Sequence, residues 1–215
     1  MYTVDQNIFS AHIAVFLTDD SNFNVLKMAQ CIQEKFSTVF PTTPEILPLP
    51  SNAPRDFPRC TFRNSQNTTL TLSLNRIDYD GTENSSNWKN NIRIILLNLF
   101  NICNDQRIST SRVGIVIHST YDDIILSKLN DLISIKCFKD SNEKHISYVT
   151  QKDIDGISLN IITDITYNSQ NPKDKLIFVD ANTNQTYILP ENLKEKMNIV
   201  ELIITEIEEK LANVF

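Results

Sequence analysis

The stretch NRIDYDGTENSSNWKNNIRIILLNLFN, Asn75 to Asn101, runs from an alternating segment through a polar turn into a long apolar segment. Trp88, the only tryptophan in the chain, stands where the apolar segment begins. From there apolar side chains recur mostly at steps of three and four residues, the spacing of one helix face. They are Trp88, Ile92, Ile95, Leu96, Leu99 and Cys103. We therefore predict a helix at Asn87–Gln106 in which Trp88 is a core residue rather than a docking platform.

The residues before this stretch predict extended structure. Residues 59–81 alternate polar and apolar side chains around Asn64–Asn67, which is typical of a hairpin of two strands. Residues 41–58 carry six of the 8 prolines, and proline excludes a helix there and disfavours a central strand. We interpret this segment as a connection that crosses the surface.

The N-terminal part predicts a strand followed by a helix. Ile8–Leu17 is apolar and rich in β-prone residues, as expected of a buried strand. Asp19, Asp20 and Ser21 follow, and each can cap the start of a helix that would end near Phe40. With the hairpin and the helix at Asn87–Gln106, this completes a β-α-β-β-α order.

The second half repeats that order. Its segments are a strand at 112–120, a helix at 121–133, a hairpin at 145–168 turning near Asp153–Gly156, strands within 175–189, and a helix begun by Pro190. The repeat, and echoes such as VFLTDD against IHSTYDD, suggest an internal duplication. We predict an α+β fold, a mainly antiparallel sheet from two tandem β-α-β-β(-β)-α units with long helices packed on one face. The units would span residues 1–107 and 108–215 and form a single globular domain.

Composition excludes several classes of function. A net charge of −6 argues against binding of nucleic acid or anionic lipid over an extended, positively charged surface. With only 3 glycines the chain has no Gly-rich loop to hold a phosphate, and its 4 cysteines have no metal-binding spacing. There is no signal peptide pattern and no apolar run long enough for a membrane span, so we expect a cytoplasmic protein without a cofactor.

No catalytic or metal-binding residue is predicted. The chain lacks a GxSxG motif, and its paired aspartates stand where caps and turns explain them. His12 and His118 lie in the apolar strand segments and His145 begins a hairpin, none at metal-ligand spacing. We interpret all three as structural residues.

Four arginines form the candidate partner-binding set. They are Arg55, Arg59, Arg63 and Arg76. Arg59 and Arg63 are four residues apart and would share one face of a strand, a placement that suits binding to carboxylate or phosphate. The competing interpretation is a solvated strand face balanced by Asp78 and Asp80.

Residues 40–120 resemble a sporadically distributed family of uncharacterised bacterial proteins. The residues that carry the resemblance are Pro58, Arg59, Phe62, Asn75, Arg76, Trp88, Arg112, Val113 and Gly114. The resemblance brings no known activity. Patchy distribution implies accessory genes, such as those of phage defence or toxin–antitoxin systems.

These observations predict a non-enzymatic protein-binding or adaptor protein of a bacterial accessory system. The alternatives are a small-ligand or nucleic-acid sensor and an enzyme of unrecognised type. The expected partner is another protein encoded nearby, with no membrane and no nucleic acid. The last helix, predicted at Glu191–Asn213, carries a heptad-like apolar seam, so a homodimer through this helix stands as an alternative to packing on the protein's own sheet.

Overall fold

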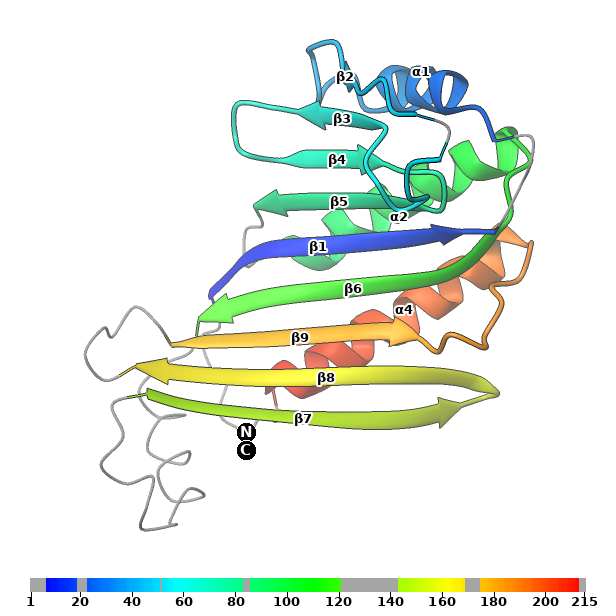
Figure 1. Cartoon of the computed structure of the whole chain (residues 1–215). Helices are drawn as coiled ribbons and strands as arrows, with labels where there is room; N and C mark the ends of the chain where they lie inside the picture. Colours follow the sequence, from blue (N-terminus) through cyan, green and yellow to red (C-terminus); the bar gives the residue numbers. More distant parts are fainter. Residues whose placement is uncertain are drawn as a thin grey trace.

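The computed structural model describes residues 7–18, 23–50, 52–82, 86–120, 143–168 and 175–212. Within them nine strands form one antiparallel sheet in the order β2-β3-β4-β5-β1-β6-β9-β8-β7 (Figure 1). The strands are β1 (Asn7–Leu17), β2 (Glu45–Ile46), β3 (Cys60–Arg63), β4 (Thr69–Leu72), β5 (Arg76–Thr82), β6 (Thr110–Thr120), β7 (Glu143–Ile154), β8 (Ile157–Asn168) and β9 (Leu176–Thr183). Because β1 pairs with both β5 and β6, the sheet is continuous from β2 to β7.

Three helices lie within the described residues. They are α1 (Val25–Lys35), α2 (Trp88–Asp105) and α4 (Leu193–Ala212). Helices α2 and α4 contact each other, and between them they contact β1, β6 and β9. Figure 1 shows both crossing behind these central strands. No helix in the described part of the chain is long and apolar enough to cross a membrane.

Side chains alternate between buried and partly exposed along β1. Ala11, Ile13 and Val15 are buried in the core, whereas Ser10 and His12 remain partly exposed. This is the two-residue period of a strand with one face against the core. We call the sheet surface that carries Ser10, His12 and His118 the open face.

The predicted fold class was wrong. Helices and an antiparallel sheet are both present, as in an α+β protein, but the described residues form one large nine-stranded sheet with three helices. They do not form two tandem β-α-β-β(-β)-α units with long helices packed on a face. The physical reason is the long pairing of β1 with β6, which fuses the strands into one sheet. The division at residue 107 stays a prediction, and the helix expected at 121–133 lies outside the described residues.

Local predictions were closer to the structure where the pattern was strong. Helix α2 begins at Trp88, which is 5% exposed and belongs to the core, as predicted. The hairpin of β7 and β8 turns at Asp155–Gly156, where both residues have positive φ as a two-residue hairpin turn requires. Residues 59–81, however, form three strands rather than two, because the chain reverses a second time between β4 and β5, where the N–H of Ser73 donates to the carbonyl of Arg76.

The predicted ends of the other two helices were less accurate. Helix α1 starts after Asn24, whose side chain accepts a hydrogen bond from the N–H of Lys27, and it ends at Lys35 rather than Phe40. Helix α4 starts at Leu193 rather than directly after Pro190. The side chain of Asn192 accepts hydrogen bonds from the first turn and so fixes this start.

Candidate ligand-binding site

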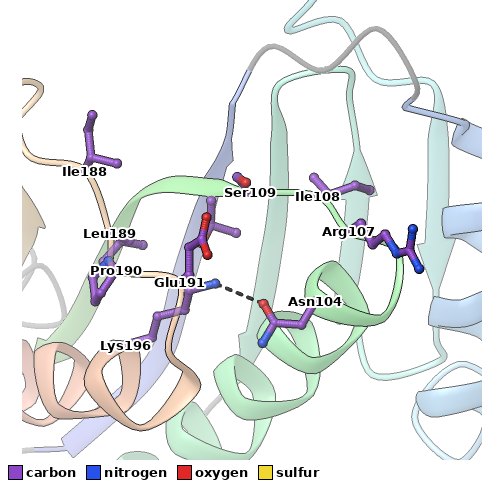
Figure 2. A pocket seen from close by; sticks show the side chains of 10 residues that line it. Asn104, Arg107, Ile108, Ser109, Ile188, Leu189, Pro190, Glu191 and Lys196 are labelled. Atoms are coloured by element: carbon purple, nitrogen blue, oxygen red, sulfur yellow. Dashed lines mark hydrogen bonds between the residues drawn. The ribbon is translucent and has the colours of Figure 1, made fainter.

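A pocket of about 420 Å³ lies where the C-terminal end of α2, the first residues of β6 and the connection into α4 meet (Figure 2). Its apolar wall is formed by Ile108, Ile188, Leu189 and Pro190. The volume falls within the range of about 300–1,000 Å³ that is usual for small-molecule sites. We call this cavity the α2–α4 pocket.

Two chain reversals create the α2–α4 pocket. After α2 the backbone turns at Arg107, which has a φ of 57°, and the N–H of Ile108 donates to the carbonyl of Cys103. This turn directs the chain back into β6. On the opposite side, the N–H of Leu189 donates to the carbonyl of Ser111 at 3.0 Å, which ties the segment before α4 to β6. The space between the two reversals is the pocket.

Lys196 of α4 lines the pocket and is only 2% exposed. Its Nζ donates to Oδ1 of Asn104 at 3.1 Å (Figure 2). The same Nζ lies 5.5 Å from the centre of the Phe100 ring. An ammonium group has three donors. Within the described residues, Asn104 is the hydrogen-bond partner of this ammonium and no carboxylate lies within ion-pair distance of it. The buried charge therefore has an amide and an aromatic face as partners, but no counter-charge.

The electrostatic surroundings of Lys196 agree with this geometry. Burial lowers the pKa of Lys196, and the neighbouring Cys103 and Glu191 oppose that shift only in part. Cys103 itself is buried, which raises the pKa of its thiol to about 12. At neutral pH this thiol is therefore uncharged and cannot compensate the ammonium. An anion that enters the pocket would compensate the positive charge of Lys196.

Thr110 supplies a second polar group without a partner. It is 2% exposed, lines the same pocket, and its Oγ1 has no hydrogen-bond partner among the described residues. Leaving a buried hydroxyl unbonded costs about 1–3 kcal/mol. A ligand oxygen at this position would restore the hydrogen bond.

Exposed charged residues surround the pocket mouth. Glu191 and Arg107 both line it and are exposed. In Figure 2 the guanidinium of Arg107 points away from the ammonium of Lys196. The positive charge available inside the pocket is therefore that of Lys196 alone, with the carboxylate of Glu191 near the entrance.

Two of the arginines predicted to bind a partner, Arg59 and Arg76, contact groups of the chain itself. Arg59 is 9% exposed, and its Nη2 donates to the carbonyls of Ala53 and Pro54. The Nε of Arg76 donates to Oδ2 of Asp78 at 2.7 Å. The contact of Arg76 with Asp78 matches the competing interpretation of a strand face balanced by aspartates, whereas Arg59 is buried and bonds to backbone carbonyls.

The remaining two arginines lie apart from the pocket as well. Arg55 Nη2 donates to the carbonyl of Leu74 at 3.4 Å, and Arg63 is exposed at the end of β3. None of the four lines the α2–α4 pocket. Their role in binding a partner stays a prediction.

Comparisons with known proteins add one likeness. No protein-family model and no curated protein matches the chain. Among solved structures, the rolling circle replication initiator protein from Geobacillus stearothermophilus is similar at 10% sequence identity and a TM-score of 0.32. The match covers 95% of this chain and 80% of that protein.

The prediction of a non-enzymatic adaptor finds no support in this comparison, in which the similar structure is a replication initiator, and we do not propose it again. At a TM-score of 0.32 the likeness gives no argument for any activity of this chain. What the chain does has to be argued from the chemistry of its own residues.

Proposed function

We propose that the protein binds a small molecule bearing a carboxylate in the α2–α4 pocket. The observation that carries the proposal is the buried ammonium of Lys196, which has no carboxylate within ion-pair distance among the described residues. Removing an ion from water without compensation costs on the order of several kcal/mol. A ligand carboxylate beside Lys196 would offset that cost, and this gain would contribute to the affinity of the ligand.

The shape and polarity of the pocket support a molecule with one charged end and one apolar end. Thr110 Oγ1 offers a hydrogen bond in the same pocket, and Leu189 and Pro190 offer an apolar wall. A carboxylate has two oxygens and can accept from the ammonium and the hydroxyl at once. The hydrocarbon part of the ligand would then cover the wall.

Charge favours a monovalent carboxylate over a phosphate. One ammonium matches one negative charge, whereas a phosphate carries nearly two at neutral pH. The carboxylate of Glu191 near the entrance would repel the additional charge. The chain also lacks the Gly-rich loop with which many proteins hold phosphate groups.

Calorimetric titration tests this proposal. We expect acetate, butyrate and hexanoate to bind, and affinity to rise about fourfold for each methylene buried, which corresponds to about 0.8 kcal/mol. The matched amides acetamide, butyramide and hexanamide should bind at least about tenfold more weakly, because they carry no charge for Lys196. Equal binding of acids and amides, or binding by neither series, would contradict the proposal.

A pair of lysine variants locates the site. Lys196→Met should abolish binding of butyrate, because methionine keeps the volume and removes the charge. Lys194→Met is the matched control, since Lys194 is exposed on the same helix and does not line the pocket. Loss of binding in both variants would show that general surface charge, and not the pocket, attracts the acid.

A further inference from the structure

A second group of reactive side chains lies on the open face, away from the α2–α4 pocket. In the pairing of β1 with β6, Ser10 is opposite His118, and His12 is opposite Val116. In the pairing of β1 with β5, His12 is opposite Asp80. Ser10, His12, Asp80 and His118 thus surround one depression of about 160 Å³.

His12 is held in its charged form by two aspartates. Its Nε2 lies 3.5 Å from Oδ1 of Asp78, and its Nδ1 lies 2.6 Å from Oδ1 of Asp80. Hydrogen bonding to Asp78 and to Asp80 raises the pKa of His12 to about 9, although burial acts in the opposite direction. At neutral pH this side chain is an imidazolium.

His118 is held in the opposite state. Burial lowers its pKa, and the positive charge of His12 lowers it further. A neutral imidazole has one nitrogen that accepts a hydrogen bond. Ser10 Oγ lies 2.7 Å from Nδ1 of His118. In the tautomer that carries the ring proton on Nε2, the hydroxyl donates to Nδ1 and the ring is placed to take its proton.

Aromatic side chains fix the orientation of that ring. Phe9 stacks on His118 with a centroid distance of 6.0 Å and an interplanar angle of 18°. Phe178 of β9 lies on it at 5.2 Å and 35°. A base whose ring cannot rotate keeps its nitrogen aimed at one oxygen, which is the geometry that a serine nucleophile needs.

We propose that Ser10 and His118 form an acyl-transfer site on the open face, with Ser10 as the nucleophile and His118 as the general base. Ser10 Oγ bonds to the carbonyl carbon of an ester, and its proton passes to Nδ1 of His118. The bond from that carbon to the leaving oxygen breaks, and the leaving group takes this proton. Water then attacks the acyl-serine by the same route, which releases a carboxylic acid and restores the serine hydroxyl.

The surroundings select a small, uncharged substrate. A depression of about 160 Å³ accommodates a short acyl group rather than a long chain. The carboxylates of Asp78 and Asp80 stand beside the depression, so a phosphodiester anion would be repelled. His12 lines the same depression, and its positive charge adds to burial in lowering the pKa of His118, so we assign it as a positioning residue.

Labelling with a fluorophosphonate tests the site on the full chain. The probe should bond to Ser10 Oγ with loss of fluoride, and mass spectrometry of peptides should find the adduct on Ser10. His118→Gln should slow labelling by about a hundredfold or more, the usual contribution of a general base. Ser111→Ala is the matched control and should label normally, because Ser111 lies on β6 and donates to the carbonyl of Phe16. An unlabelled Ser10, or equal labelling rates in His118→Gln and the unmodified protein, would overturn the proposal.

The pH profile of the unmodified protein supplies a readout that does not depend on folding of a variant. The labelling rate should rise as His118 loses its proton below pH 6.5 and should then stay constant through neutral pH. A rate that keeps rising above neutral pH is that of an unactivated hydroxyl and would overturn the assignment. With chromogenic substrates, p-nitrophenyl acetate should be cleaved. Cleavage of bis(p-nitrophenyl) phosphate instead would exclude acyl transfer as the reaction.

Discussion

Helix α4 carries two buried charged side chains, and they differ in the partners that surround them. Glu206, in its second half, is 4% exposed and forms an ion pair with Lys152 of β7 at 2.5 Å. Lys196, in its first turn, is 2% exposed and has the amide of Asn104 as its partner. The first charge is compensated within the chain, and the second faces a pocket. The contrast teaches that an unpaired buried charge beside a cavity is a recognition feature, whereas a paired one is structural.

Breaking the paired charge should have the largest effect. Lys152→Met leaves Glu206 buried without a counter-charge and should lower the free energy of unfolding by about 2–3 kcal/mol. This is less than for a fully buried pair, because Lys152 is partly exposed. Urea denaturation measures the change. Lys210→Met is the matched control, since Lys210 donates to Thr150 rather than to a carboxylate. If both variants lose the same free energy of unfolding, the ion pair between Lys152 and Glu206 does not stabilise the protein more than the contact of Lys210 does.

Removing the unpaired charge should have a smaller effect of opposite sign. Lys196→Met should raise the free energy of unfolding by about 1–2 kcal/mol, because an apolar side chain of similar volume replaces an uncompensated ion. Lys194→Met, on the exposed side of the same helix, should change stability by less than about 0.5 kcal/mol. Thermal denaturation of the three proteins without ligand distinguishes them. A destabilised Lys196→Met would mean that the ammonium already has its full set of partners.

Much of the fold could be predicted wherever one segment carries its own signal. The apolar stripe from Trp88 to Cys103 predicted α2 almost to the residue, because helical periodicity is local. The turn at Asp155–Gly156 was predictable for the same reason. The pairing of β1 with β6 was not, because it joins strands that are far apart in sequence and leaves no local pattern. That pairing makes the sheet continuous and overturned the predicted fold class.

In the candidate sites too, features with a local sequence pattern could be predicted, and contacts between distant segments could not. Lys196 falls in step with Ile199, Val200 and Ile203 on the buried face of α4, so its burial could have been inferred from spacing. Its place beside a cavity could not be inferred in the same way, since the other walls come from α2, β6 and the connection into α4. Ser10 and His118 are 108 residues apart and meet only through strand pairing. The four arginines were conspicuous in sequence because they cluster there, but the contacts that Arg59 and Arg76 make within the chain depend on the fold and could not be predicted from that clustering.

The most direct test of the account is the pKa of Lys196, followed by NMR of isotope-labelled lysine side chains with and without butyrate. In the protein without ligand the pKa should lie below its ordinary value of 10.5, because burial disfavours the charged form. Saturating butyrate should raise it, because the carboxylate stabilises the ammonium, and butyramide should not. An ordinary pKa in the ligand-free protein, or a lowered pKa that butyrate leaves unchanged, would contradict the claim that this buried charge is compensated by a ligand.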